Sequence, residues 1–406
     1  MSVLKYVLGH PTLRLIAAAL LLLGAHNASV YPYQSLIAIE KIGLSKGTFS
    51  LVLVLASVVA VTSSVLFGIL GDQYGARRRI ALITAFCSTL GLALMLLVPG
   101  KVSMVLTHGL LLPLSASIYG QLFALLRIAN PAEGQGREMI QSTIRSAMSI
   151  GFLLMLVFWT LVFGLGAPVM AVYLSGGAAS LGISLLLYFR WPRDGAKGLN
   201  DARSGLNLAE AMREIARPLI LSRVLMIGAV ASAGNVYMVL ISLVFEASPI
   251  RGPSDVALYV GVVAGWEVPA MILLPRLVAH LPRATVLAWG AGLYALHLAA
   301  LPLLTDSALL WALTLAGGVG GAAIITLPIG YYQDLLRERP GAAASMLAVQ
   351  KLVADVVSAG AFFVGTLIGG YESVALIGVA ISAGGALALM LADRRGWLRP
   401  DAAGPA

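Results

Sequence analysis

Long apolar segments separated by short polar ones run through the whole chain and limit what it can fold into. Each has roughly 18 to 28 residues, and a helix needs about 20 apolar residues to cross the hydrocarbon core of a bilayer. The segments are residues 13–37, 47–70, 80–98, 102–127, 143–165, 168–190, 218–246, 255–276, 285–304, 308–333, 343–368 and 373–392. The sequence therefore predicts an all-α polytopic membrane protein with about twelve transmembrane helices.

Composition argues against a soluble fold and a nucleic-acid partner. Of the 406 residues, 59% are hydrophobic and 11% are charged, whereas charged residues make up about 25% of a soluble domain. The net charge is +9, but the Lys and Arg residues fall between the apolar segments and not on one basic, aromatic-rich face. We therefore expect the lipid bilayer to surround the chain, with no nucleic acid as a partner.

Basic residues indicate the orientation in the membrane, because loops rich in Lys and Arg resist translocation. With a cytoplasmic N-terminus, most of them fall in inner segments. The outer loops keep Lys41, Lys46, Lys101 and Arg251. This asymmetry predicts an even number of spans with both termini in the cytoplasm.

One long polar connection divides the spans six and six. We expect an N-terminal six-helix bundle at residues 1–190, a cytoplasmic linker at 191–217, a C-terminal six-helix bundle at 218–392 and a cytoplasmic tail at 393–406. Within the linker, residues 206–216 form either a short amphipathic helix on the inner membrane surface or a plain solvated segment.

Motifs of the common enzyme classes are absent from the sequence. It has no HExxH, GxSxG, Walker A or CxxC pattern, and its five His residues are scattered. We therefore expect no enzymatic activity, no cofactor and no metal site. Without an ATP site, any work done by the protein has to come from a gradient.

The connection between the second and third spans carries the most informative motif. In Gly68-Ile-Leu-Gly-Asp72-Gln-Tyr-Gly75-Ala-Arg77-Arg-Arg, a tight turn at Gly75 precedes a cytoplasmic basic cluster. It resembles the loop signature of the major facilitator superfamily at Gly68, Asp72, Gly75 and Arg77, while Gln73 and Ala76 replace basic residues of that signature. The resemblance implies that Asp72 contacts span eleven through a helix dipole and closes an inner gate. An ordinary positive-inside loop is the alternative.

Three further stretches resemble the bacterial sugar efflux transporters of that superfamily. They are Gln121-Leu-Phe-Ala-Leu followed by Gly136-Arg-Glu and Arg145, then Trp266-Glu-Val-Pro-Ala-Met271, then Tyr332-Gln-Asp followed by Pro340-Gly-Ala-Ala-Ala-Ser345. The resemblance implies two six-helix bundles, alternating access to a central site, and a bacterial inner-membrane location.

Charged residues inside spans point to a site, because a charge at mid-membrane costs at least about 2.5 kcal/mol and usually faces a cavity. Glu267 lies near the middle of span eight, and Pro269 loosens the helix there. A carboxyl group at this depth can exchange a proton, so we expect Glu267 to bind solute or carry a proton. The alternative is a structural hydrogen bond between helices.

Lys351 and Asp355 share one face of span eleven and can neutralise each other. The pair is either static or broken and re-formed by solute or proton during a cycle. Arg145 and Arg223 lie near the inner surface, where we expect them to snorkel and to serve gating or anchoring.

Uncharged polar residues at similar depth are candidates for solute contacts, since sugar hydroxyls need amide and aromatic partners. These candidates are Asn27, Gln34, Gln121, Asn235 and Gln350. The alternative is that they hold helices together. We expect His26 and His297 to be satisfied packing residues, and the glycines of Gly317-Gly-Val-Gly-Gly321 to let helices pack closely.

Together these features favour a monomeric secondary transporter that exports a sugar or a similar small polar solute in exchange for protons. Glu267 is the leading proton carrier. Export of apolar drugs is the first alternative, and a non-transporting membrane sensor is the second. The direction of transport follows from the resemblance alone.

Overall fold

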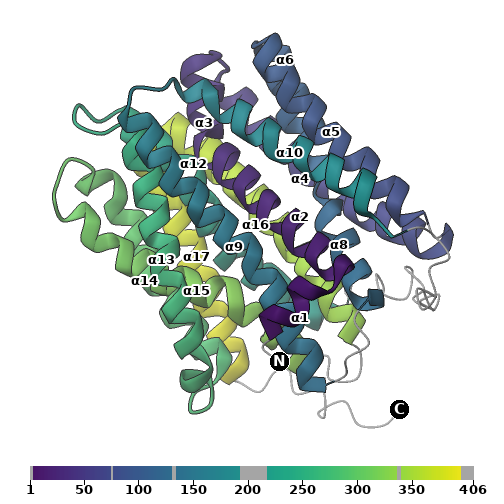
Figure 1. Cartoon of the computed structure of the whole chain (residues 1–406). Coiled ribbons are helices and arrows are strands. Elements are labelled where there is room, and N and C mark those ends of the chain that lie inside the picture. The colour runs from purple at the N-terminus through teal and green to yellow at the C-terminus, as the bar shows by residue number, and fades with distance from the viewer. Residues whose placement is uncertain (1–2, 75, 130–133, 193–216, 336–339, 395–406) are drawn as a thin grey trace. The chain divides into compact units, whose positions relative to one another are not determined.

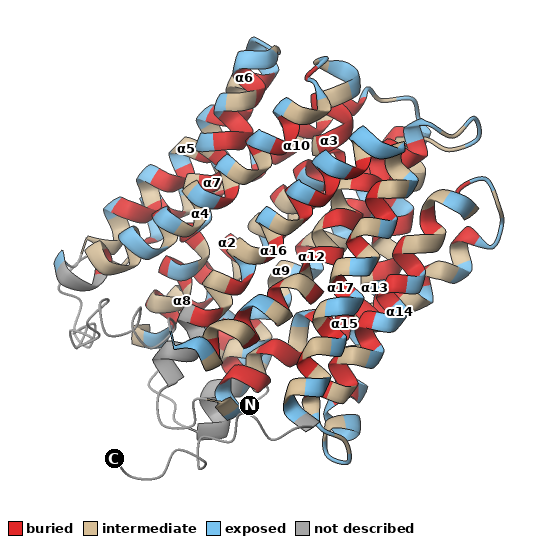
Figure 2. Cartoon of the chain, turned by 180° about the vertical axis from the view of Figure 1, so that it is seen from behind, coloured by how far each residue is buried: buried red, intermediate tan, exposed pale blue. Residues whose placement is uncertain are grey.

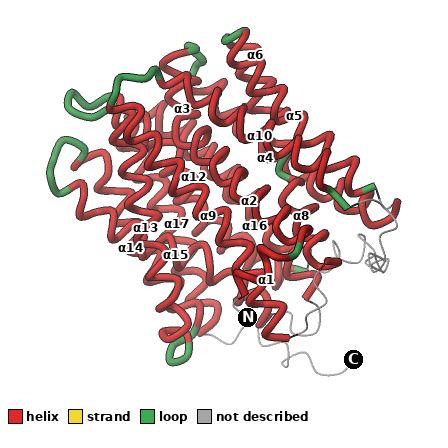
Figure 3. Tube along the Cα trace, viewed as in Figure 1, coloured by secondary structure: helices red, strands yellow, loops and turns green. Residues whose placement is uncertain are grey.

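The computed structural model describes residues 3–74, 76–129, 134–192, 217–335 and 340–394. Within these ranges every regular element is helical and no strand occurs (Figure 3). Twelve helical segments are long and apolar enough to cross a membrane, from Pro11–Lys41 to Gly370–Asp393. The prediction of an all-α protein with twelve spans is therefore confirmed.

The chain divides into two compact units, Met1–Gly205 and Leu206–Ala406 (Figure 1). The predicted linker helix at 206–216 lies outside the described residues. The N-terminal unit contains α1 (Val3–Gly9), α2 (Pro11–Val30), η1 (Tyr31–Tyr33), α3 (Gln34–Leu36), η2 (Ile37–Lys41), α4 (Lys46–Tyr74), α5 (Arg77–Leu97), α6 (Lys101–Leu106), η3 (Thr107–Leu111), α7 (Leu112–Leu114), α8 (Ser117–Ala129), α9 (Gly134–Gly164), η4 (Val169–Ala171) and α10 (Val172–Arg190).

The C-terminal unit contains six long helices, one for each of its spans. They are α12 (Pro218–Glu246), α13 (Pro253–Val278), α14 (Arg283–Leu304), α15 (Leu310–Leu335), α16 (Pro340–Ile368) and α17 (Gly370–Arg394). Proline at the first position begins α12 and α13, where its fixed φ suits a helix start and its missing N–H costs no hydrogen bond.

Two described spans of the N-terminal unit contain π-helical turns. The first passes from α2 through a 3-10 turn that contains Pro32 into the π-helical η2. The fourth contains the π-helical η3, followed by Pro113 in α7. Proline cannot donate a backbone hydrogen bond, so the helix changes its winding near each of these positions.

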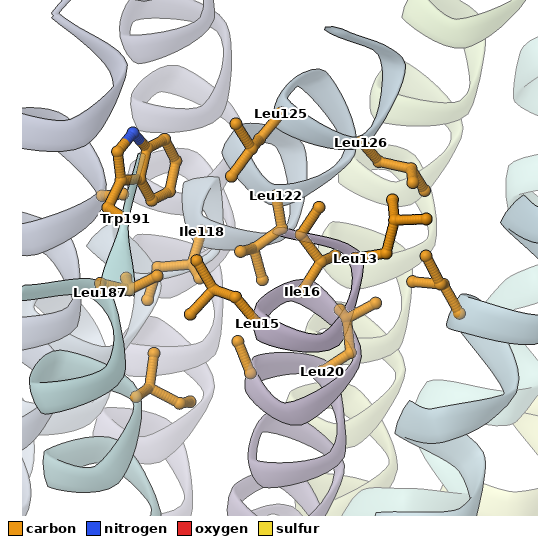
Figure 4. Packing of buried hydrophobic residues seen from close by; sticks show 14 of the residues in the cluster. Leu13, Leu15, Ile16, Leu20, Ile118, Leu122, Leu125, Leu126, Leu187 and Trp191 are labelled. Atoms are coloured by element: carbon orange, nitrogen blue, oxygen red, sulfur yellow. The ribbon is translucent and has the colours of Figure 1, made fainter. Parts of the chain in front are cut away.

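The distribution of apolar side chains fits a hydrocarbon solvent. Leu13, Ile16 and Leu122 belong to a buried cluster between α2 and α8 that also includes Trp191 (Figure 4). Exposed positions recur along the helices (Figure 2). Large apolar side chains occupy many of them, as with Leu154 on α9, which is 62% exposed. A water-soluble surface would not carry so many of them, whereas a lipid-facing surface favours them.

Glycine lets α2 and α9 touch backbone to backbone. A Cβ atom added at Gly24 would overlap the carbonyl oxygen of Met148, and one added at Gly151 would overlap the carbonyl oxygen of Leu21. Close approach of this kind stabilises helix pairs in membranes, because lipid supplies no hydrophobic force between helices and dispersion contacts must hold them.

Replacing Gly24 with leucine is expected to destabilise the N-terminal unit by about 1–3 kcal/mol, because the new side chain forces α2 away from α9. The melting temperature of the purified protein in detergent should fall by several degrees. Gly120→Leu is the matched control, since Gly120 is exposed on α8 with no atom within 4 Å of an added Cβ. Equal melting temperatures for the two variants would contradict the backbone contact.

Candidate functional site

Glu267 lies near the middle of the 26-residue helix α13 and is partly exposed. Pro269 lies two residues further along inside the same helix. Because proline has no N–H, the carbonyl of Gly265, four residues before it, loses its intrahelical donor. The backbone next to Glu267 is therefore less tightly bonded than the rest of α13.

The carboxyl group of Glu267 lies over a glycine of α15. A Cβ atom added at Gly321 would come within 2.8 Å of Glu267 Oε1 and 3.3 Å of Tyr294 Cε2. At Gly318, one turn earlier, an added Cβ would come within 2.6 Å of the Val263 carbonyl oxygen. The backbones of α13 and α15 therefore approach closely, and the missing side chain at 321 makes room for the carboxyl group.

A second carboxyl group, Asp355 on α16, is held by two partners. Lys351 Nζ lies 2.8 Å from Asp355 Oδ2, one turn away on the same helix. Asn235 Nδ2 on α12 donates to Asp355 Oδ1 at 2.7 Å. The Lys351 side chain is 62% exposed and that of Asp355 17%, so a partly buried carboxylate has a positive partner that reaches outward.

The candidate Gln350 lies next to this group on α16. Its side chain is buried, and its Oε1 atom has no hydrogen-bond partner among the described residues. A Cβ atom added at Gly228 of α12 would come within 3.2 Å of the Gln350 backbone oxygen. Three polar candidates, Asn235, Gln350 and Asp355, are thus gathered along the contact between α12 and α16.

In the N-terminal unit the polar candidates are dispersed. Gln121 on α8 is buried, and its Nε2 donates to the backbone oxygen of Phe67 on α4 at 3.1 Å. This hydrogen bond joins α8 to α4. Gln121 therefore does hold helices together, which was the alternative to a solute contact. Asn27 on α2 and Gln34 on α3 are each partly buried. His26 is satisfied, with Ser180 Oγ 3.0 Å from its Nδ1.

The gating motif is described only in part. Gly68 lies in α4 and Arg77 begins α5, whereas Gly75 and the side chain of Asp72 lie outside the described residues. Arg78 Nη2 donates to the backbone oxygen of Tyr188 at 2.9 Å and so ties this connection to α10. Arg145 is exposed on α9. The contact between Asp72 and span eleven stays a prediction.

The expectation that Arg223 snorkels to the inner surface is wrong. Its side chain, on α12, is 2% exposed, and Nη1 contacts Asp393 on α17 and the hydroxyl oxygen of Tyr331 on α15. Tyr331 in turn donates to Asp393 Oδ1 at 3.1 Å. A guanidinium buried inside the bundle needs a carboxylate partner. In the sequence, the acidic residue Asp393 at the end of the last span could have suggested such a partner.

A cluster of buried aromatic side chains within the C-terminal unit was also not predicted from the sequence. The His297 ring on α14 lies with its centroid 4.9 Å from that of Tyr237 on α12 and 5.9 Å from that of Tyr259 on α13. Both ring nitrogens of His297 lack a hydrogen-bond partner among the described residues. His297 is therefore a packed residue, as expected, but not a satisfied one.

Two shallow surface clefts lie at helix ends, one beside Thr48 and Lys101 and the other beside Asp306 and Glu372. Neither contains a candidate residue. Within the described ranges, no group of three or more His, Cys, Asp or Glu side chains is placed to hold a metal ion.

Comparison with known proteins identifies the class. The family model of the Major Facilitator Superfamily matches residues 16–360. The chain belongs to the major facilitator superfamily, and it is a multi-pass membrane transporter and not an enzyme.

Two relatives are similar to this chain over most of its length. A protein of Deinococcus radiodurans with an inferred assignment as a sugar efflux transporter is 27% identical over 400 residues, covering 94% of this chain and 97% of that protein. Sugar efflux transporter A of Dickeya chrysanthemi is 25% identical over 340 residues, covering 82% of this chain and 84% of its own.

Solved structures show the same fold at low sequence identity. The crystal structure of the nucleoside transporter NupG matches with a TM-score of 0.76 and 17% identity, covering 94% of this chain and 98% of that one. The structure of a D-xylose-proton symporter matches with a TM-score of 0.70 and 16% identity, covering 98% and 100%. These similarities establish the fold.

Proposed function

We propose that this transporter exports a sugar, or a similarly hydroxylated small solute, in exchange for protons. The sugar efflux transporters among its relatives support the class of solute. The observation that carries the proton coupling is Glu267, a partly exposed carboxyl group in the middle of α13 that lies over Gly321.

The carboxyl groups of Glu267 and Asp355 differ in their charged partners, and this difference supports separate roles for them. Asp355 has Lys351 as a fixed positive partner, whereas Glu267 has no ion-pair partner within the described residues. A carboxyl group without a counter-ion is tolerated in hydrocarbon when it is protonated and ionises when water reaches it. Alternating exposure would therefore load and unload a proton at Glu267.

The remaining candidates are proposed to bind solute. Sugar hydroxyls form hydrogen bonds with amides and charged groups, and Asn235, Gln350 and Asp355 gather such groups along the contact between α12 and α16. Lys351 and Asp355 would exchange partners with the solute. From the N-terminal unit, Asn27, Gln34 and Gln121 are proposed to add further contacts.

The transport cycle is proposed to be a rocking of the two halves, with the loop from Gly68 to Arg77, including Asp72 and Gly75, closing the inner side and Arg145 taking part in gating. The protein would act as a monomer in a bacterial inner membrane, with both termini in the cytoplasm.

The proposal is tested with purified protein reconstituted in lipid vesicles. Radiolabelled mono- and disaccharides are loaded inside, a pH gradient is imposed with the outer side acid, and efflux is followed with and without an uncoupler. We expect gradient-dependent efflux of at least one sugar. Efflux of apolar dyes without sugar transport would favour a drug exporter, and no counterflow of any solute would favour a sensor; either result would overturn the proposal.

A further inference from the structure

The glycine-rich stretch of α15 holds two ionisable side chains on one face. Gly317 and Gly321 are one helical turn apart, so they share a face of α15. A Cβ atom added at Gly317 would come within 3.0 Å of three atoms of the His297 ring, and one added at Gly321 within 2.8 Å of Glu267 Oε1. Both residues provide space for ionisable groups from neighbouring helices.

The ionisable side chains whose rings pack against His297 are all tyrosines. These groups are Tyr237 from α12, Tyr259 from α13, and Tyr294 from its own helix, at ring-centroid distances of 4.9, 5.9 and 5.2 Å. Helix α15 presents Gly317, and α17 packs against α14 through Gly378 and Leu298. His297 therefore lies among tyrosine rings, with no ion-pair partner within the described residues.

Four buried polar atoms gather in this cluster without hydrogen-bond partners among the described residues. They are the hydroxyl oxygens of Tyr237 and Tyr259 and both ring nitrogens of His297. Leaving such an atom unbonded costs about 1–3 kcal/mol, and polar atoms in protein interiors are satisfied by protein groups or ordered water. Four of them together favour hydrogen bonds to ordered water between them, and a chain of water and polar groups of this kind can conduct protons.

The cluster reaches Glu267 through tyrosines. The Tyr294 ring lies 3.3 Å from the position of an added Cβ at Gly321, beside the Glu267 carboxyl group. The Tyr237 ring lies next, with its centroid 6.3 Å from that of Tyr294. Each of these tyrosines is a direct neighbour of His297.

We propose that Tyr259, His297, Tyr237 and Tyr294 form a buried proton relay that serves Glu267 inside the C-terminal bundle; this rests on the proposed role of Glu267 as proton carrier. A proton arrives on the free nitrogen of the neutral imidazole, and the proton on the other nitrogen leaves to a tyrosine hydroxyl or a water. That group passes its own proton to the Glu267 carboxylate. One proton has moved, and His297 is left as its other neutral tautomer. Rotation of the imidazole ring returns the relay to its starting state before the next proton.

The relay points to the Pro253 end of α13. Tyr259 lies in the second turn of this helix, eight residues before Glu267. Its ring packs against Trp311 at 5.9 Å, and the Arg251 guanidinium lies 5.7 Å from the Trp311 ring centroid. A proton entering at this end would reach Glu267 through the interior of the C-terminal bundle and not along the path of the solute. The proton and the solute therefore need not share a route.

Tyr259→Phe tests the relay, because it removes one hydroxyl and keeps the ring. Tyr332→Phe is the matched control, since Tyr332 is equally buried in the same unit, with an unpartnered hydroxyl outside the cluster. We expect Tyr259→Phe to slow pH-driven efflux at least about tenfold, with a much smaller effect on solute counterflow, and Tyr332→Phe to match the parent protein. Equal rates for both variants would overturn the relay and leave the proposed function intact.

A spectroscopic measurement separates the relay from transport. The infrared carboxyl band of Glu267, identified by its loss in Glu267→Gln, is followed after transfer to heavy water. We expect slower deuterium exchange of this band in Tyr259→Phe and His297→Leu than in the parent protein or Tyr332→Phe. The same exchange rate in all four would overturn the relay, whether or not the parent protein shows pH-driven efflux.

The glycine face supplies a second test. Gly321→Ala is expected to shift the Glu267 band and to slow pH-driven efflux, because the new methyl group displaces the end of a flexible side chain and leaves the backbone in place. Gly265→Ala is its control, as Gly265 lies two residues from Glu267 with open space around an added Cβ. An unshifted band in Gly321→Ala would contradict the placement of the carboxyl group.

Discussion

Replacing Glu267 with glutamine is expected to reduce pH-driven sugar efflux by about 100-fold or more, the range found when a group that transfers protons is removed. Glutamine keeps the size of the side chain and its place over Gly321 but cannot gain or lose a proton. Efflux from reconstituted vesicles under an imposed pH gradient measures the loss. Sugar counterflow, which needs no net proton movement, should fall far less.

The control for this substitution is Glu372→Gln. Glu372 is exposed in the first turn of α17, away from the middle of the span. Its replacement changes the net charge by the same amount and should leave the pH-driven rate near that of the parent protein. If Glu267→Gln exported sugar at the parent rate under the same gradient, the proton would have another carrier.

Asp393→Ala is expected to destabilise the C-terminal unit by about 3–5 kcal/mol, because it leaves the buried guanidinium of Arg223 without its carboxylate. Arg223 is among the largest fully buried side chains, and it joins α12 to α15 and α17 through Tyr331 and Asp393. Denaturation of the purified protein in detergent, followed by tryptophan fluorescence, measures the change.

The double variant Arg223→Leu/Asp393→Ala separates charge from packing. Replacing both members of a buried ion pair with apolar residues is often nearly neutral, so we expect the double variant to recover most of the stability lost in Asp393→Ala. If the double variant lost as much stability as Arg223→Leu and Asp393→Ala together, the pair would contribute packing and not a compensated charge.

Much of this architecture could be predicted from the sequence because a bilayer imposes simple rules on a chain. Apolar segments of nearly constant length gave the twelve spans, and most span boundaries lie within a few residues of those in the structure. The loop signature at Gly68, Asp72, Gly75 and Arg77 indicated the superfamily, which the match over residues 16–360 confirms.

Partners across helices could not be predicted from the sequence, since they depend on how each span is rotated. Asn235 and Asp355 lie on different helices 120 residues apart, and no periodic pattern relates them. Depth alone suggested that Arg223 reaches the inner surface, but the rotation of α12 directs it to Tyr331 and Asp393. The spacing of Lys351 and Asp355, in contrast, lies within one helix and could be read directly.

The same limit applies to the cluster around His297. Its tyrosines come from three helices, and each one alone is typical of a packed aromatic residue. Only the three-dimensional structure shows that their rings surround the imidazole and that Gly317 lies beside it. The glycines of residues 317–321 were expected to serve close helix packing, and Gly318 and Gly320 do so, whereas Gly317 and Gly321 accommodate side chains.

The π-helical turns η2 and η3 have a mechanical consequence for the first and fourth spans. A wider turn takes up an extra residue and weakens the regular ladder of backbone bonds, so a helix bends most readily there. The end of the first span, at η2, and the start of the fourth span, before η3, can then bend while α2 is held against α9 at Gly24. One end of the N-terminal unit can thereby flex without separating α2 from α9.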